Sequence, residues 1–126
     1  MNIATALSEL AVIEWVLRGE PTNETEFNAM FRKVVGADDN GSAIESSDPA
    51  DFGVTWAEVK AKYDELVASE PMRLLRVERN RLLSETDWWA SADLTMTQAQ
   101  IDYRQALRDI TNTYTSLDDV VWPEKP

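Results

Sequence analysis

One stretch decides the fold: residues 72–88, MRLLRVERNRLLSETDW. It places two pairs of leucines between arginines, a pattern that predicts a helix over about 72–85. A run of threonine, aspartate and two tryptophans at 86–89 ends this helix, and residues 91–93 read as a turn. The arginines of the stretch are Arg73, Arg76, Arg79 and Arg81.

A second helix is expected after that turn, over about 96–112. Thr95 and Gln98 have the spacing of a capping box, and apolar positions then recur at helical spacing. The two helices together predict a helical hairpin, on which residues 117–126 lie as an extended tail. The side chains expected to hold the hairpin together are Leu82, Leu83, Leu107 and Ile110.

Towards the N-terminus, the next expected helix covers about 55–69. Thr55 and Glu58 form its capping box, and Pro71 falls at its end or in the first turn of the following helix. Residues 37–53 are rich in turn formers and acidic side chains, so we expect a loop there.

A further helix is expected over about 23–35. It begins with a capping box at Asn23 and Glu26, and Gly36 supplies its C-terminal cap. Residues 3–17 change pattern partway, which predicts a short helix followed by either a strand or a final turn.

These patterns predict a mainly α fold: a small helical domain with a C-terminal helical hairpin, and room for one short strand or hairpin near the N-terminus. We expect two regions. Residues 1–70 hold 14 acidic and 5 basic residues and form an acidic, mainly helical N-terminal region. Residues 71–126 form the hairpin with its tail.

The composition excludes most catalytic chemistry. The chain has no histidine and no cysteine, so disulfides, thiolate nucleophiles and the usual zinc sites are ruled out. Its four glycines form no phosphate-binding loop, and no paired carboxylates stand out among the 23 acids. We therefore expect no enzyme activity, no cofactor and no metal.

Charge and hydropathy exclude two further classes of ligand. The formal net charge of −11 repels nucleic acid and anionic lipid, so neither is an expected partner. No apolar run approaches the roughly 20 residues of a membrane span. The first residues lack the basic start of a secretory signal, so none is expected.

Arginines and tryptophans are the candidate binding residues. Arg73, Arg76 and Arg79 share one flank of their helix, and Trp88-Trp89 stand at its end, where the two rings point in different directions. Both residue types are enriched at protein interaction hot spots. Three interpretations stay open: a phosphate site, a contact strip for a partner protein, and arginines that only pair with the acids of the N-terminal region.

Three blocks of the C-terminal half resemble the phage tail assembly chaperone family, whose members are also called tail-fibre assembly proteins. They are RVERNRLLSETDW at 76–88, YRQALRDI at 103–110 and VWP at 121–123. The resemblance covers about 72–126, and small proteins of cyanophages and other tailed phages look similar. In such proteins the segment that corresponds to 1–70 is variable.

The resemblance implies a non-enzymatic bacteriophage protein that assists tail or tail-fibre assembly by binding tail or fibre subunits. The alternative is a permanent component of the virion, and a small regulator or enzyme is a more distant one. It implies location in the host cytoplasm during assembly, or in the virion, and leaves association into a homo-oligomer open. The expected partner-binding residues are Arg73, Arg76, Arg79, Trp88, Trp89, Arg104, Arg108 and Trp122.

Overall fold

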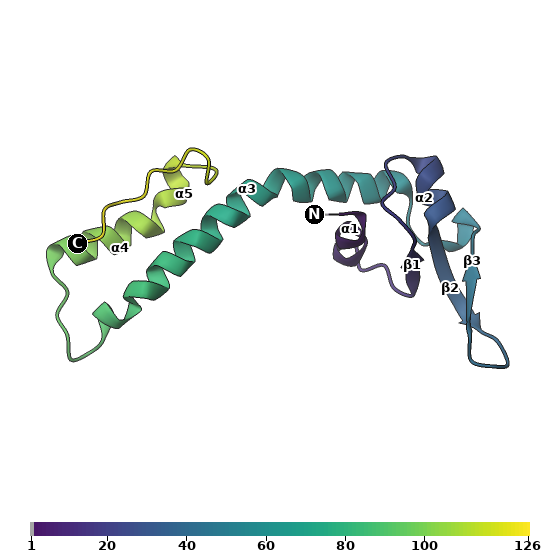
Figure 1. The fold of residues 1–126 in the computed structure, drawn as a ribbon, viewed down its shortest axis with the longest axis horizontal. Coiled ribbons are helices and arrows are strands. Elements are labelled where there is room, and N and C mark those ends of the chain that lie inside the picture. The colour runs from purple at the N-terminus through teal and green to yellow at the C-terminus, as the bar shows by residue number, and fades with distance from the viewer. Residues whose placement is uncertain (1) are drawn as a thin grey trace. The chain divides into compact units, whose positions relative to one another are not determined.

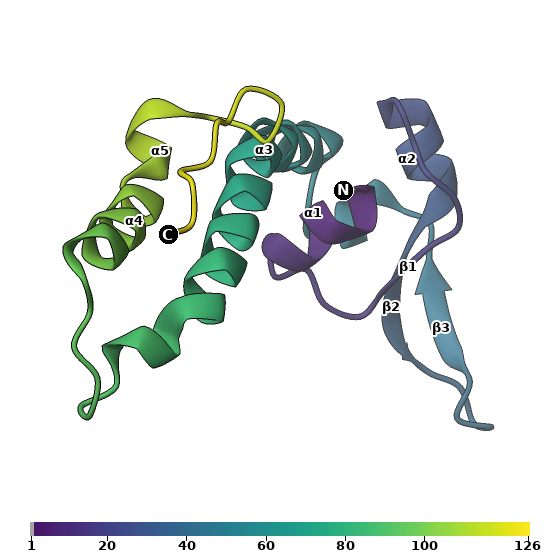
Figure 2. The ribbon, with the colours of Figure 1, turned by 60° about the vertical axis from the view of Figure 1, so that its left-hand side comes forward.

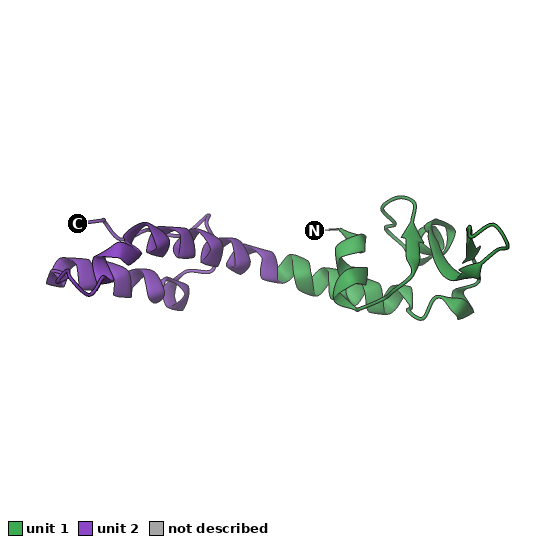
Figure 3. Cartoon of the chain, turned by 90° about the horizontal axis from the view of Figure 1, so that it is seen from below, with its two compact units in different colours: residues 1–68 green, residues 69–126 purple. Residues whose placement is uncertain are grey.

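A computed structural model describes residues 2–126 and divides the chain into two compact units. Unit 1 comprises Met1–Ala68 and unit 2 comprises Ser69–Pro126 (Figure 3). The longest helix, α3 (Trp56–Thr86, 31 residues), supplies its first turns to unit 1 and the remainder to unit 2. None of the described helices is long and apolar enough to cross a membrane.

Unit 1 combines short helices with a three-stranded antiparallel sheet in the order β1-β2-β3 (Figure 1). Trp15 pairs with Lys33 between the first two strands, and Val34 pairs with Glu45 between the second and third. Its elements are α1 (Ile3–Glu9), β1 (Trp15–Leu17), α2 (Glu24–Met30), β2 (Phe31–Ala37), β3 (Ala43–Ser46), the 3₁₀ helix η1 (Pro49–Asp51) and the start of α3.

The sheet corrects the predicted fold class: the chain is mainly helical, but it has a three-stranded sheet where one short strand or hairpin was predicted. The expected helix over 23–35 ends at Met30, where Phe31 adopts an extended conformation with φ −85° and ψ 140°. Val34 and Val35 are β-branched and favour a strand, and β2 finds hydrogen-bonding partners on both sides. Pairing with β1 and β3 therefore overrides a helical pattern, and part of the predicted loop over 37–53 becomes β3.

Three phenylalanines form the centre of the unit 1 core. Phe27, Phe31 and Phe52 are fully buried, with ring centroids 4.7–6.0 Å apart. Burial of each such side chain stabilises the fold by about 1.5–3 kcal/mol. The other buried members of this core are Ile3, Ala6, Leu7, Val54 and Val59.

Unit 2 is a helical hairpin in which α4 (Gln98–Arg108) and α5 (Ile110–Thr113) lie alongside the second part of α3 (Figure 2). Its core contains Trp89 and Tyr103. Leu82 and Leu83, predicted to pack against Leu107 and Ile110, pack on the buried cluster that contains Leu107. Ile110 is buried as well, but it is not part of this cluster. The 3₁₀ helix η2 (Asp87–Ala90) follows α3 and contributes Trp89.

Two predicted helix boundaries are wrong. Pro71 lies inside α3, so the helices expected over 55–69 and 72–85 are one helix. A proline removes one backbone hydrogen bond, yet Val59 and Leu75, on either side of it, are fully buried and hold both parts of the helix.

The start of α4 also differs from the prediction. The capping box forms between Thr97 and Gln100, two residues later than the predicted Thr95 and Gln98. Both pairs have the sequence of a capping box. The later start leaves Met96 outside the helix, where it packs against the unit 2 core.

Candidate partner-binding surface

The residues expected to bind a partner divide into an exposed and a buried set. Trp89 and Arg104 are only 6% and 7% exposed, so neither presents its side chain to a partner. Arg79 and Trp122 are half-buried. The exposed members are Arg73, Arg76, Trp88 and Arg108.

Arg104 holds the end of α3. Its guanidinium donates to the carbonyl oxygen of Leu83 at 3.0 Å, to Thr86 Oγ1 at 2.6 Å and to Asp87 Oδ1 at 2.9 Å. The last carbonyls of a helix lack partners within the helix, so a cation from a neighbouring element stabilises them. Arg104 is therefore a residue that joins α4 to α3 within unit 2.

The rings of Trp88 and Trp89 point in different directions, as predicted. Trp88 is 62% exposed, whereas Trp89 lies in the core beside Tyr103, with ring centroids 6.0 Å apart. The two indoles are nearly perpendicular, at 76°. Lys125 of the tail lies over the Trp89 ring, 5.9 Å from its centroid. Trp88 is thus the aromatic side chain of this doublet that a partner can reach.

Two of the four arginines of α3 pair with acids of the same helix, and Arg79 bonds to Asn80. Arg73 makes a bidentate contact with Glu70 at 2.6 and 2.8 Å, and these hydrogen bonds lower the pKa of the Glu70 carboxyl. Arg81 bonds to Glu78, lowering the pKa of that carboxyl, and also to Glu85. Because water screens these pairs, they add little to stability and a partner can displace them.

Arg76 differs from these neighbours. Across the described residues 2–126 it has no hydrogen-bond or ion-pair partner, and its side chain is exposed. An exposed, unpaired guanidinium can bind a carboxylate without first breaking another contact. Arg76 is consequently the arginine of α3 that is most available to an acidic partner.

Two apolar residues beside the arginines lie at the surface of α3. Leu74 is 40% exposed and Val77 is 54% exposed, and their three-residue spacing puts them on one side of α3. Of the Leu74-Leu75 pair, only Leu75 is buried. We define the α3 surface as Leu74, Val77 and Trp88 with Arg73, Arg76 and Arg81.

The α3 surface has the composition of a binding surface. Leu74 and Val77 are flanked by arginines along α3, and Trp88 follows in η2. Charged side chains around an apolar centre are typical of protein interfaces. Within the described part of the chain, no group of three or more acidic side chains is placed to hold a metal ion.

Comparison with known families bears on unit 2. The family model for the phage tail assembly chaperone protein matches residues 72–126. The resemblance seen in the C-terminal half is therefore confirmed, over less than half of the chain and entirely within unit 2. No curated protein matches the chain significantly, and neither does any solved structure.

The match includes all residues of the α3 surface and leaves unit 1 outside. Unit 2 is thus similar to a family of proteins described as phage tail assembly chaperones. The sheet and the aromatic core of unit 1 have no counterpart in these comparisons.

Proposed function

We propose that this protein is a non-enzymatic bacteriophage assembly factor that binds a tail or tail-fibre subunit in the host cytoplasm. The observation that carries the proposal is the family match over residues 72–126. It is supported by the α3 surface, where an exposed tryptophan and two exposed aliphatic side chains lie within that matched region.

The α3 surface suits a client with an apolar patch and acidic side chains. Trp88 would be the anchor, because a large aromatic ring buries much apolar area at low entropic cost. Arg76 and Arg73 would attract the acidic groups and so raise the association rate, whereas burial of Trp88 would slow dissociation. Trp89 and Arg104 support this surface from within unit 2 and do not touch the client.

The alternative is that the protein stays in the virion as a permanent component. The exposed apolar side chains fit either role, since a structural neighbour would cover them as a client does. The protein's copy number in purified particles separates the two: an assembly factor is absent or far below the copy number of its client.

Co-expression with each tail and fibre protein of the same phage, followed by affinity capture, tests the proposal. We expect one of these subunits to be retained by the wild-type chain. Trp88→Ala should raise the dissociation rate by about tenfold or more, as for an interface hot spot. Arg76→Glu should slow association and flatten its salt dependence.

Two control variants make the experiment specific. Ile101→Ala removes a comparably exposed apolar side chain from α4, and Lys62→Glu reverses a charge in unit 1, so both should retain the client. Equal loss of capture in the controls, or capture unaffected by Trp88→Ala, would contradict the α3 surface. Failure of every tail and fibre subunit to bind would contradict the assembly role.

A further inference from the structure

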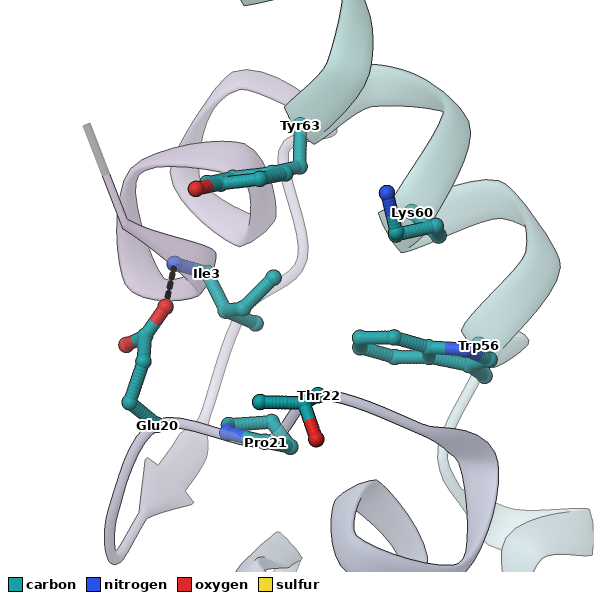
Figure 4. Close-up of a pocket in the computed structure, with 7 residues that line it drawn as sticks. All are labelled: Ile3, Glu20, Pro21, Thr22, Trp56, Lys60 and Tyr63. Atoms are coloured by element: carbon teal, nitrogen blue, oxygen red, sulfur yellow. Dashed lines mark hydrogen bonds between the residues drawn. The ribbon is translucent and has the colours of Figure 1, made fainter. Parts of the chain in front are cut away.

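Unit 1 contains a pocket of about 180 Å³ that the assembly role of unit 2 does not use. It lies between the start of α3, the start of α1 and the segment joining β1 to α2 (Figure 4). Its walls are the indole of Trp56, the side chain of Ile3 and the ring of Tyr63, above a floor of Pro21 and Thr22. Glu20 and Lys60 complete the lining.

Three polar side chains of this pocket already have partners, whereas the Trp56 indole N–H and the Tyr63 hydroxyl form no hydrogen bond within residues 2–126. Glu20 Oε1 accepts a hydrogen bond from the Ile3 amide at 2.8 Å, and Thr22 Oγ1 donates to Glu26 at 2.9 Å. Lys60 forms an ion pair with Asp64, and its ammonium lies 5.5 Å from the Tyr63 ring centroid. The open space therefore offers contact mainly with apolar and aromatic surfaces.

The size of the pocket limits what it can hold. Pockets for cofactors and drug-sized ligands are about 300–1,000 Å³, so this one is too small for a nucleotide or a similar cofactor. It is much larger than the roughly 30 Å³ share of one water molecule. A single aliphatic or proline side chain is the class of group that it suits, and aromatic walls are the usual site for proline and extended peptide segments.

The charge at the rim favours a basic neighbour of that side chain. Glu20 lines the pocket and Glu26 accepts hydrogen bonds from the lining residue Thr22, so two carboxylates lie at or next to it. The charge of Lys60 is neutralised by Asp64. The pocket also lies in the more acidic part of the chain, where residues 1–70 carry 14 acids against 5 bases. An apolar side chain next to lysine or arginine thus fits both the walls and the rim.

We propose that this pocket binds one leucine- or proline-sized side chain from an extended, basic segment of the client. The identity of the client rests on the proposed function, whereas the pocket's preference for such a segment does not. Unit 1 would then select the client through a short sequence, and the α3 surface of unit 2 would bind it separately.

Short peptides test the preference on the full chain. The probe is acetyl-Lys-Leu-Pro-Lys-amide, with acetyl-Lys-Ser-Gly-Lys-amide as the apolar control and acetyl-Glu-Leu-Pro-Glu-amide as the charge control. In amide and indole N–H spectra of ¹⁵N-labelled protein, we expect saturable shifts at Trp56, Thr22 and Lys60 with the probe. The serine–glycine peptide should cause none, and the acidic peptide should bind at least fivefold more weakly.

A matched pair of variants tests the site. Thr22→Leu should fill the pocket and raise the dissociation constant of the probe by about tenfold or more. Thr22→Val has the same shape as threonine and should leave the dissociation constant within about twofold. Glu20→Gln retains an oxygen for the Ile3 amide and should weaken the probe by about twofold to fivefold, as expected for one exposed ion pair.

Several outcomes would overturn this site. They are equal binding of the serine–glycine peptide, shifts confined to unit 2, or an unchanged dissociation constant in Thr22→Leu with its fold intact. Trp88→Ala should leave probe binding unchanged, which separates the two proposals. A probe that binds while no tail or fibre subunit is captured would contradict the assembly role and leave the pocket standing.

Discussion

Arg104 is the residue whose contacts do most to fix unit 2. Arg104 bonds to the Leu83 carbonyl and to the Thr86 and Asp87 side chains, where α3 ends. No other residue of α4 makes this set of hydrogen bonds within residues 2–126. The ion pair of Arg104 with Asp87 is the weakest part of this arrangement, because the Asp87 side chain is 65% exposed to water. The buried bond to Thr86 and the partly buried bond to Leu83 are the important ones.

Arg104→Ala should lower the free energy of unfolding by about 2–4 kcal/mol, since it leaves the buried Thr86 hydroxyl and the Leu83 carbonyl with fewer partners. Arg104→Lys should recover only part of this loss, because an ammonium cannot reproduce the planar, forked geometry. Urea denaturation followed by circular dichroism measures both. Arg108→Ala, an exposed change on the same helix, is the control; an equal cost in both would show that Arg104 carries no special role.

The two adjacent tryptophans should give opposite phenotypes. Trp89→Ala removes a buried ring and should cost about 3–5 kcal/mol of stability. Trp88→Ala should change stability by less than about 0.5 kcal/mol and act on client binding instead. Thermal and urea denaturation of both variants, alongside capture of the client, checks the division. Large destabilisation by Trp88→Ala would mean that its ring supports the fold.

At the level of the elements, the sequence was informative where contacts are local. Helices α2, α3 and α4 have side-chain caps or apolar spacing that can be recognised without knowledge of the fold. The hairpin of unit 2 can be recognised in the same way. A strand is one of the two alternatives predicted for residues 3–17, and β1 agrees with it. β2 and β3 are not predicted, because Phe31–Ala37 continues the apolar spacing of α2 and Ala43–Ser46 lies in a stretch rich in turn formers. Nothing within Phe31–Ala37 indicates that Trp15–Leu17 and Ala43–Ser46 will lie on its two sides.

The candidate site divides in the same way. The arginines and tryptophans could be named from residue type and from the family resemblance. Which of them is buried could not be predicted from residue type, because Trp88 and Trp89 are both tryptophans. They differ only in the direction in which η2 points their side chains. The exposure of Leu74 depends on which side of α3 the other helix of unit 2 covers.

The hairpin itself should depend on Leu107. This side chain is fully buried in the unit 2 core, so Leu107→Ala should cost about 2–5 kcal/mol. Leu82 is only half-buried, and Leu82→Ala should cost less. Urea titration measures both values. A cost below about 0.5 kcal/mol for Leu107→Ala would contradict the packing of α4 on α3.

For the whole molecule, stability should depend on pH at both ends of the scale. Hydrogen bonds from Arg73, Arg81 and the Thr22 backbone lower the pKa values of Glu70, Glu78 and Glu26 below their ordinary 4.5. A carboxyl with a depressed pKa in the folded state stabilises the fold above its ordinary pKa. That contribution, kept small by water around these exposed carboxyls, is lost as the pH falls through the lower, folded-state value.

The alkaline limit should come from Tyr103. Burial, with a smaller contribution from the Glu85 charge, raises the pKa of this phenol above its ordinary 10. Its contribution to stability is therefore complete below pH 10 and is lost as the pH rises through the folded-state value. Unfolding free energies from urea titrations between pH 3 and about 11 should decline at both ends. Tyr103→Phe should remove part of the alkaline decline, and an unchanged profile would contradict this assignment.

The exposure of Trp88 has a practical consequence for spectroscopy. Of the five tryptophans, Trp15, Trp56 and Trp122 are half-buried and Trp89 is buried, so Trp88 is the most accessible indole. Acrylamide, an uncharged collisional quencher, should therefore reduce the red-shifted part of the emission first. A client that covers Trp88 should lower this quenching and shift the emission to the blue, which would make assembly visible in real time without any added label.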